Sequence, residues 1–431
     1  MNTATIAHEK SFRLLYSTKE EFPNPRVDLT ELFSGGLVAR GHVIDWHMRP
    51  VARCAGGLLT LSRHENLLLT RKLSDETFVG RVGNAFFDLW HDLRLLWLPS
   101  IRRYDFIQVR DKFFGGLLGL VGAKIARTPY YYWMSFPFAE ASLFRARDNS
   151  LHLTSVKRFV LLINGVLSSL FLYRIILPHA DHIFVQSDRM KADVASHGID
   201  AAKMFVVPMC INWKRISSRL LLPPSDDWAQ KSPLIVYVGT LVRARRMDFL
   251  IETFAFVHRQ RPDAVLVVIG DAPPSDMAIL HASADRLGVA PFVKFLGFLP
   301  MEESWRYVKV AQVCVSPIRP SPMLDPGSPT KVIEYLALGK AVVANEQPDQ
   351  ARVLKESGAG LVVPFEVEPF ARAILDLLAD PSRAADMAKK GPDYVRRMRS
   401  YETLVPELEA EYLRLLPGVK GKLSAKSSLF H

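Results

Sequence analysis

A short segment in the last third of the chain joins a loop of small residues to a charged helix start. The segment reads Asp325-Pro326-Gly327-Ser328-Pro329-Thr330-Lys331 and continues into Val332-Ile333-Glu334. Backbone N–H groups at a helix start point outward, and the helix dipole there favours an anion. Glu334 lies about one turn into the helix, where it could accept hydrogen bonds from ligand hydroxyls. The combination predicts a site for a phosphate joined to a polyol, as in a nucleotide sugar. The alternative is an ordinary capped helix, in which Glu334 and Lys331 are solvated and bind no ligand.

Three arginines follow a predicted strand that ends in glycine. The sequence Val238-Gly239-Thr240 leads within a few residues to Arg243, Arg245 and Arg246. Arginine presents a planar, permanently charged fork that suits phosphate oxygens. Ligands of α/β proteins bind at the carboxyl ends of parallel strands. We therefore expect a diphosphate clamp here, with a solvated basic turn as the alternative.

The rest of the sequence predicts the elements that position these groups. Short apolar runs alternate with amphipathic segments through most of the 431 residues, which is typical of βαβ units with parallel sheets. The expected strands are 13–17, 42–46, 106–109, 130–135, 182–186 and 204–207 in the first half, and 234–238, 264–269, 293–296, 313–316, 341–344 and 360–363 in the second. The proline- and aspartate-containing stretch 217–232 predicts an interdomain linker. We place a first doubly wound domain at 1–216, a second at 233–400, a helix at 401–416 and a tail at 417–431.

Positive charge is concentrated in the first half of the chain. The net charge is +11, and residues 1–231 carry 30 basic and 21 acidic side chains. Such an excess suggests an anionic partner, of which phospholipid headgroups or a phosphorylated substrate fit better than nucleic acid, because no basic stripe with stacking aromatics is present. The cysteines Cys54, Cys210 and Cys314 have neither disulfide-framework nor zinc-site spacing, so we expect a reducing, cytoplasmic location and no metal.

Two apolar segments in this basic half suggest contact with a membrane surface. The run 159–173 has only 15 residues and contains polar ones, whereas a bilayer span needs about 20, so we expect it not to cross. A second stretch, 86–97, is rich in phenylalanine, tryptophan and leucine. Arg102, Arg103, Lys157 and Arg158 lie beside these segments. An interfacial helix and a buried core helix are both compatible with this pattern.

The block from residue 234 to about 378 resembles the C-terminal domain of the family-4 retaining glycosyltransferases, which have the GT-B fold. The matching motifs, in family order, are Tyr237-Val238-Gly239-Thr240, Arg245-Arg246-Met247-Asp248, Val268-Ile269-Gly270-Asp271, Val293-Lys294-Phe295-Leu296-Gly297, Val313–Pro317 and Lys331-Val332-Ile333-Glu334-Tyr335. The first half is similar more loosely, through Arg40-Gly41-His42-Val43 and Val206-Val207-Pro208. The resemblance implies two Rossmann-like, doubly wound α/β domains facing a central cleft, with the helix at 401–416 packing back on the first domain.

The resemblance also implies a reaction and the residues that carry it. The reaction is a retaining transfer of a sugar from a UDP- or GDP-linked donor, without a metal or another cofactor. The catalytic residues would be Arg245, Asp325 and Glu334, with Arg245 on the donor diphosphate and Glu334 on the ribose. The donor-binding residues would be Gly239, Thr240, Arg243, Arg245, Gly297, Phe298, Gly327, Ser328, Lys331 and Glu334.

Three departures from the family pattern affect this assignment. Pro326 stands where the family has the first glutamate of its Glu-x7-Glu element, and Asp325 is the candidate replacement. Thr240 replaces a basic residue, whose role Arg243 would take. The histidine that many members carry after the strand at 130–135 is absent, which leaves Glu140 and Ser135 as acceptor-side candidates.

The sequence thus predicts a peripheral glycosyltransferase at the cytoplasmic membrane face. It would move a sugar to a lipid-linked glycan in polysaccharide biosynthesis. A nucleotide-sugar 2-epimerase and a non-catalytic GT-B scaffold are the alternatives. The sequence has no HExxH, P-loop or GxSxG motif, so metalloprotease, NTPase and α/β-hydrolase functions lack their usual signatures. We expect His47, just past a predicted strand, to be a surface residue.

Overall fold

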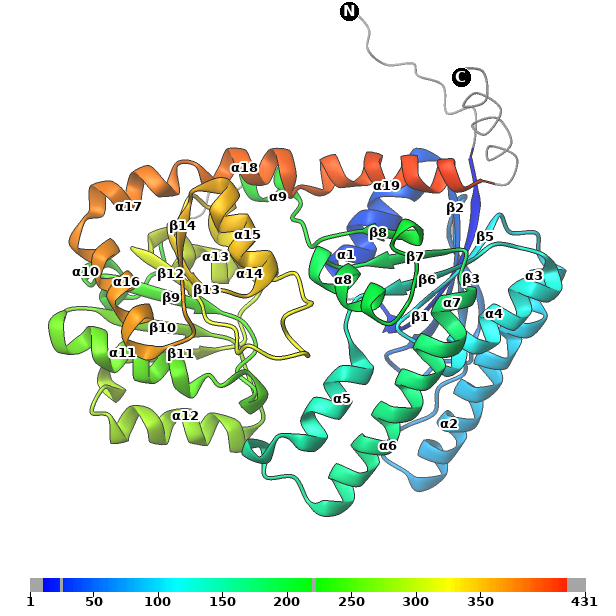
Figure 1. The fold of residues 1–431 in the computed structure, drawn as a ribbon, viewed down its shortest axis with the longest axis horizontal. Coiled ribbons are helices and arrows are strands. Elements are labelled where there is room, and N and C mark those ends of the chain that lie inside the picture. Colours follow the sequence, from blue (N-terminus) through cyan, green and yellow to red (C-terminus); the bar gives the residue numbers. More distant parts are fainter. Residues whose placement is uncertain (1–10, 24–25, 219–221, 417–431) are drawn as a thin grey trace, which may run out of the picture. The chain divides into compact units, whose positions relative to one another are not determined.

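The computed structural model describes residues 11–23, 26–218 and 222–416. The chain divides into two compact units, each built around its own sheet (Figure 1). Unit 1 comprises Met1–Ala139, Ile163–Pro208 and Tyr401–His431, and unit 2 comprises Glu140–Leu162 and Met209–Ser400.

Unit 1 contains an eight-stranded sheet in the order β3-β4-β2-β1-β5-β6-β7-β8. The strands are β1 (Arg13–Phe22), β2 (Val43–Pro50), β3 (Gly57–Ser62), β4 (Glu65–Leu69), β5 (Phe106–Arg110), β6 (Tyr130–Met134), β7 (His182–Val185) and β8 (Met204–Val206). Every neighbouring pair is parallel except β3 and β4. The sequence prediction missed β3 and β4, which form an antiparallel hairpin at one edge of the sheet.

Helices connect the parallel strands of unit 1. They include α1 (Val27–Leu29), α2 (Phe78–Leu93), α3 (Leu98–Ile101), α4 (Phe114–Ala126), α7 (Leu177–His179) and α8 (Asp188–Ser196). A further helix of this unit, α19 (Tyr401–Leu415), follows the last strand of the chain. Glycines allow α4 to approach the sheet closely, because a Cβ at Gly119 would lie 2.8 Å from Cγ2 of Val109 on β5. Helices α5 (Phe138–Arg147) and α6 (Ser155–Phe171) carry the chain between the two units.

Unit 2 contains a six-stranded parallel sheet in the order β11-β10-β9-β12-β13-β14. The strands are β9 (Leu234–Val238), β10 (Val265–Ile269), β11 (Val293–Gly297), β12 (Val313–Ser316), β13 (Val342–Asn345) and β14 (Gly360–Val363). All six were predicted from their apolar runs, with ends that differ by one residue at most.

Both faces of this sheet are covered by helices. These are α9 (Trp213–Ser217), α10 (Asp227–Lys231), α11 (Asp248–Gln260), α12 (Pro274–Arg286), α13 (Met301–Val310), α14 (Thr330–Ala337), α15 (Pro348–Ser357), α16 (Val367–Ala379), α17 (Pro381–Ala388) and α18 (Gly391–Met398). Along β9, Ile235 and Tyr237 belong to one apolar core, whereas Leu234 and Val236 belong to another. This alternation, with a core on each face, makes the unit doubly wound.

The division of the chain differs from the expected one around residues 217–232. The stretch lies wholly within unit 2, and its described part includes α10. Asp226, just before α10, accepts a hydrogen bond from Tyr307 Oη of α13 at 2.6 Å. The segment expected to be a linker is therefore attached to unit 2, because its prolines and aspartates flank a short helix. The chain passes between the units near residues 139–140, 162–163, 208–209 and 400–401.

Helix α19 belongs to unit 1 although it follows unit 2 in the sequence. Glu409 binds the side chains of Arg40 at 2.7 Å and His42 at 2.8 Å. Tyr412 Oη donates to the Gln108 side chain of β5 at 2.6 Å. These buried contacts attach the C-terminal helix to the first sheet. The expected tail at 417–431 lies outside the described residues.

Candidate active site

Three glycines mark the carboxyl ends of β9, β10 and β11, which lie at the same edge of the unit 2 sheet. Gly239, Gly270 and Gly297 have positive φ angles of 150°, 143° and 68°. The N–H of Gly239 donates to Ile269 O at 2.9 Å, and that of Gly270 to Gly297 O at 2.8 Å. A Cβ at Gly270 would overlap the carbonyl oxygen of Gly239, so only glycine fits this close approach. We call this region, together with the start of α14, the carboxyl edge of unit 2.

Lys331, at the start of α14, reaches the end of β9. Its Nζ donates to Tyr237 Oη at 3.1 Å and lies 4.2 Å from the centre of the Tyr237 ring. A Cβ at Gly239 would lie 3.0 Å from this Nζ, so the glycine leaves room for the lysine. Burial lowers the pKa of Lys331 well below its ordinary value, and the nearby charge of Arg245 lowers it further while Glu334 raises it. An anionic ligand at this edge would therefore stabilise the ammonium form.

Glu334 lies one turn further along the same helix. Burial raises the pKa of its carboxyl to about 7, against the lowering effects of Trp305 of α13 and Lys331. A carboxyl with this pKa titrates near neutral pH. It can accept hydrogen bonds from ligand hydroxyls when ionised and donate one when protonated.

The expected clamp of three arginines is reduced to one available guanidinium. Arg243 lies beside Asp276 of α12, whose carboxylate accepts from the Arg243 N–H at 2.8 Å and lies 3.6 Å from its Nε. Arg246 pairs with Asp248 at 3.1 Å. Among the described residues, no ion pair involves Arg245, which is half-buried in the turn 243–245. Burial raises the pKa of Tyr237 to about 12, and the charge of Arg245 partly opposes this rise. The same charge lowers the pKa of Lys331, so Arg245 acts on both groups at this edge.

The loop before α14 is attached to the protein through its carbonyl groups. Gln347, a buried side chain just before α15, donates through Nε2 to the carbonyl oxygens of Asp325 at 2.9 Å and Gly327 at 2.8 Å, and more weakly to Leu324 at 3.3 Å. Carbonyl oxygens repel phosphate, so turning them toward Gln347 favours an anion on the other side of the loop. No sequence pattern predicts this role, because glutamine is a common residue before a helix.

Ser328 and Asp325 have protein partners in this loop. The hydroxyl of Ser328 donates to Asp349 at 2.6 Å and accepts from the Met209 N–H at 3.0 Å, and Arg399 pairs with Asp349 at 2.6 Å. The Asp325 carboxylate accepts from the Ser321 N–H at 3.2 Å. Both side chains thus shape the loop, and the backbone of Gly327 and Ser328 is the part left to approach a ligand.

The remaining donor-side predictions lie at the surface of the same edge. Thr240 is exposed, and its carbonyl oxygen accepts from Tyr237 Oη at 3.2 Å. Phe298 follows Gly297 at the end of β11, and 77% of its side-chain surface is exposed. An aromatic ring exposed to this extent beside a strand end is suited to stack on a planar base.

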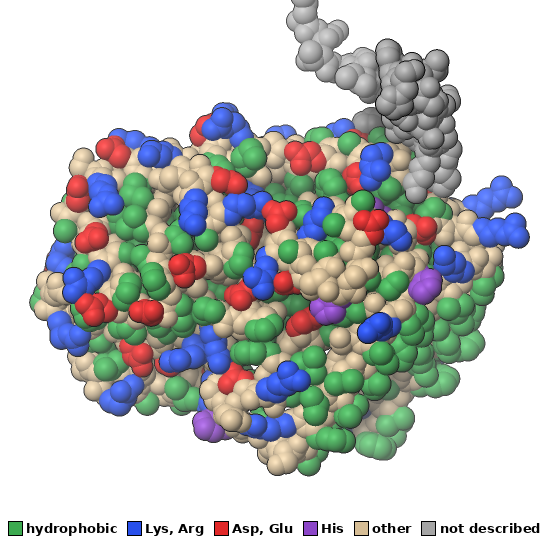
Figure 2. Space-filling model, viewed as in Figure 1, with side chains coloured by type: hydrophobic (Ala, Val, Ile, Leu, Met, Phe, Trp, Pro, Cys, Tyr) green, Lys and Arg blue, Asp and Glu red, His purple; other side chains and the backbone are tan. Residues whose placement is uncertain are grey.

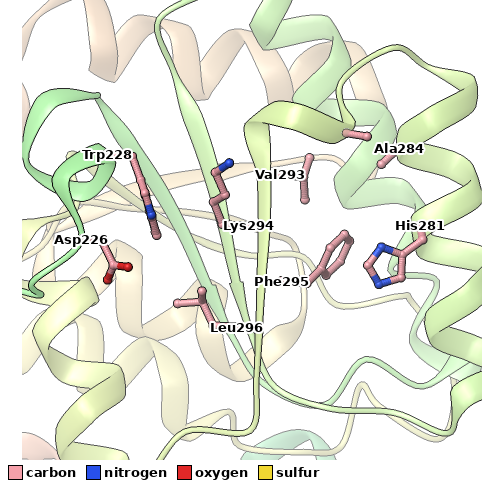
Figure 3. A pocket seen from close by; sticks show the side chains of 9 residues that line it. Asp226, Trp228, His281, Ala284, Val293, Lys294, Phe295 and Leu296 are labelled. Atoms are coloured by element: carbon pink, nitrogen blue, oxygen red, sulfur yellow. The ribbon is translucent and has the colours of Figure 1, made fainter.

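A groove of about 420 Å³ lies along the outer edge of β11 (Figure 3). Val293 and Phe295 point toward His281 of α12, whereas Lys294 and Leu296 lie on the side of Trp228 and Asp226. Lys294 Nζ donates to Pro291 O at 2.7 Å, and Asp226 accepts from Tyr307. The charged groups of this groove are therefore already satisfied within the protein.

The two acceptor-side candidates, Ser135 and Glu140, belong to different units. Ser135, after β6, donates through its backbone N–H to Asp111 at 2.9 Å, and its hydroxyl also binds Asp111. It is buried in unit 1, whereas Glu140, in the first turn of α5, is grouped with unit 2.

The expectation that His47 lies at the surface is wrong. Its ring is completely buried, stacks on His91 of α2 at 3.6 Å and hydrogen-bonds Ser17 at 3.0 Å. Burial lowers its pKa well below the ordinary value, with further lowering by His91 and Lys112. Helix α2 covers this end of β2, which the sequence pattern could not show.

Comparison with known proteins supports the resemblance for unit 2. Residues 232–380 match the family model described as glycosyl transferases group 1. Over 162 residues the chain is 33% identical to a GDP-mannose-dependent alpha-(1-6)-phosphatidylinositol monomannoside mannosyltransferase from Mycolicibacterium smegmatis, covering 37% of this chain and 42% of that protein. It is 27% identical over 196 residues to the lipopolysaccharide core biosynthesis glycosyltransferase LpsE of Rhizobium meliloti, covering 44% and 51%. The chain thus spans about half the length of these relatives.

Solved structures extend the likeness to the whole fold. Sucrose-phosphate synthase from Thermosynechococcus elongatus superposes with a TM-score of 0.69 at 18% identity, covering 94% of this chain and 99% of that one. HepE from Anabaena, in complex with UDP, gives 0.65 at 15% identity, covering 94% and 100%. At these identities the likeness concerns the fold alone. The expected GT-B architecture, with two Rossmann-like parallel sheets, is confirmed.

Proposed function

We propose, from the group 1 glycosyl transferase segment at residues 232–380, that this protein transfers a sugar from a nucleotide diphosphate-sugar to an acceptor. The observation that carries the proposal is the cationic group at the carboxyl edge of unit 2. Lys331 and Arg245 lie there beside strand-end glycines, and neither forms an ion pair among the described residues. A diphosphate would supply the missing negative charge.

The donor would bind with its diphosphate near Arg245, Lys331 and the start of α14. The backbone of Gly327 and Ser328 would approach the phosphates or the sugar, and Phe298 would contact the base. Glu334 would accept hydrogen bonds from the ribose hydroxyls. The helix start and two cations favour the charge on a bound diphosphate.

In the transfer step, the bond between the anomeric carbon and the diphosphate oxygen breaks, and the acceptor oxygen forms the new bond. Negative charge grows on the departing diphosphate, where Arg245 and Lys331 would stabilise it. The acceptor proton would pass to that diphosphate. Departure and attack on the same face of the sugar give retention, which the family resemblance implies. Asp325 would act by holding the loop rather than by contacting the ribose, because its carboxylate binds the Ser321 N–H.

The acceptor is proposed to be a lipid-linked glycan at the cytoplasmic membrane face. Two relatives support this proposal by name, since one acts on a phosphatidylinositol monomannoside and another in lipopolysaccharide core biosynthesis. The charge excess of residues 1–231 suits an anionic membrane surface. The proposal includes a place in polysaccharide biosynthesis, and its support is the name of the Rhizobium meliloti relative, a lipopolysaccharide core biosynthesis glycosyltransferase.

A product assay tests the proposed reaction and separates it from the alternatives. The protein is incubated with UDP- and GDP-sugars, with and without a bacterial lipid extract. A glycosyltransferase releases nucleoside diphosphate rapidly only when the extract is present, and a glycosylated lipid forms in equal amount. An isomerised donor without any extract would instead identify a 2-epimerase, and no turnover with any donor would indicate a non-catalytic scaffold.

A further inference from the structure

Helix α2 has an inverted distribution of apolar and polar side chains. Most of its exposed residues are large and apolar, with exposed fractions from 46% to 75%, and they are Phe78, Val79, Val82, Phe86, Leu89 and Trp90. Its buried residues are Gly80, His91 and Asp92. In a helix surrounded by water the apolar stripe faces the core. The arrangement here indicates an apolar environment outside the protein.

Buried polar contacts fix the rotation of α2. Asp92 forms an ion pair with Lys112, which follows β5, and both side chains are nearly completely buried. His91 stacks on His47 with the two ring planes 7° apart. Turning the apolar stripe inward would expose these rings and separate a buried ion pair. The outward orientation is therefore a stable feature of unit 1.

Helix α6 carries a second outward apolar stripe. The large apolar residues exposed on it recur along the helix, and they are Val156, Phe159, Val160, Leu162, Ile163, Val166, Leu167 and Leu170. The helix continues to His179 and is, by length and composition, apolar enough to cross a membrane, which corrects the expectation that the run is too short. Its last turns belong to the unit 1 core, because Leu172, Ile176 and Leu177 are buried there. This packing favours a helix that lies in an interface over one that crosses it.

The surroundings of the two helices match the boundary of a bilayer. Hydrophobic side chains gather over α2, α4 and α6 on the face shown in Figure 2. Trp90 and Trp97 are both exposed at the end of α2, and the centres of their rings lie 5.7 Å apart. Arg81 and Lys157 are exposed on the same helices. Tryptophan and basic residues beside an apolar stripe are typical of helices that lie at the level of lipid headgroups.

We propose that α2 and α6 insert their exposed apolar side chains into the hydrocarbon of a lipid bilayer. This deepens the proposed function, on which the choice of a membrane as partner rests. The attachment is mainly hydrophobic, with the basic residues as secondary contacts. The protein would then reach a lipid-linked acceptor at the depth of its headgroup, and the acceptor would not have to leave the membrane.

Vesicle co-sedimentation tests this inference. The wild type is compared with Phe86→Ser/Trp90→Ser in α2 and Phe159→Ser/Ile163→Ser in α6. The control is Ile279→Ser/Met398→Ser, which removes exposed apolar residues from unit 2. Vesicles of neutral phosphatidylcholine are used at about 1 M salt, where the Debye length is about 3 Å and charge attraction is screened. The wild type and the control should bind, and each helix variant should bind about 100-fold more weakly.

Other results would overturn the inference. Binding only to vesicles that contain phosphatidylglycerol, and only at low salt, would mean attachment by charge alone. A wild-type dimer that both helix variants convert to monomers, without vesicle binding, would mean that a second copy covers the apolar stripes. Thermal shifts with GDP and UDP are recorded for all variants, so that loss of the fold or failure of the proposed donor site is seen separately from loss of membrane binding.

Discussion

The two sheets differ in whether the charged side chains at their carboxyl edges have ion-pair partners. In unit 1, Arg110 is completely buried and pairs with Asp28 at 2.6 Å, and Lys112 pairs with Asp92. In unit 2, Lys331 is half-buried beside a tyrosine, and Arg245 has no ion-pair partner among the described residues. The unit 1 edge neutralises its own charges, whereas the unit 2 edge holds a positive charge that a ligand can neutralise. A positive charge without a carboxylate partner is typical of a ligand site, whereas the charges of a structural network are paired within the protein.

Arg110→Met is the most direct way to break the unit 1 network. It leaves Asp28 buried with only the half-exposed Arg26 nearby. Breaking a buried ion pair by removing one partner costs about 3–5 kcal/mol of unfolding free energy. Urea denaturation followed by tryptophan fluorescence measures the loss.

The matched control is Arg189→Ala, which breaks an exposed ion pair with Asp193. It should cost less than about 1 kcal/mol. If the two variants lose similar unfolding free energy, the buried Arg110–Asp28 ion pair does not stabilise unit 1 more than an exposed ion pair does.

Lys331→Met tests the other half of the comparison. The variant should lower kcat/KM for sugar transfer by about 100- to 1,000-fold, because a charge that stabilises the departing diphosphate is lost. The unliganded protein should be equally stable or slightly more stable, because removing Lys331 also removes the cost of desolvating its ammonium group. Steady-state kinetics and thermal unfolding of the same preparation provide both readouts. A large loss of stability would show that Lys331 has a structural role instead.

The pH dependence of stability reports on Glu334. Its carboxyl pKa is raised from 4.5 to about 7 in the folded protein, so the folded state retains a proton that the unfolded state has lost. Stability relative to Glu334→Gln should therefore fall by about 2–3 kcal/mol as the pH rises from about 4.5 to 7, and the difference should be constant below and above this window. Denaturation midpoints across this range measure it. A difference that does not change with pH would mean that the carboxyl is not buried as described.

Gln347→Ala gives the smallest of the expected effects. With the carbonyl groups of Asp325 and Gly327 released, affinity for GDP or UDP should fall about tenfold, or about 1.4 kcal/mol, while affinity for the nucleoside alone is unchanged. Gln350→Ala is the control, because Gln350 is equally buried but binds Ser316 and Asn345 instead of the loop. Calorimetric titration of both variants with the nucleoside and with its diphosphate measures these affinities. Equal losses for nucleoside and diphosphate would indicate a general disturbance of the fold.

Sequence periodicity was sufficient for the unit 2 sheet but not for all of unit 1. The unit 2 strands are mostly apolar runs separated by amphipathic helices, and the central strands β9, β10, β12 and β13 are buried almost throughout. The β3–β4 hairpin lacks this signal, because β3 is exposed along its whole length. The inverted helix α2 also has an apolar period, but periodicity does not show which side faces the protein.

The candidate site was predictable only where residue type determines chemistry. Lys331 and Glu334 were predicted from the small-residue loop and charged helix start, with an ordinary capped helix as the alternative, and their role in binding stays a prediction. The sequence could not show that Asp276 and Asp248 engage Arg243 and Arg246, since these partners depend on packing. The same holds for His47, whose burial depends on α2.

Nucleotide binding by Arg245→Ala and Arg246→Ala tests the central claim most directly. The two arginines are neighbours in one turn, and only Arg246 has a carboxylate partner, Asp248. Thermal unfolding is recorded with UDP, GDP, ADP and their sugars, since a ligand at 100 times its dissociation constant stabilises by about 2.7 kcal/mol. We predict that one nucleotide stabilises the wild type and Arg246→Ala to a similar extent, and that Arg245→Ala loses most of this effect. Stabilisation by no nucleotide, or equal stabilisation of both variants, would contradict a diphosphate site at the carboxyl edge of unit 2.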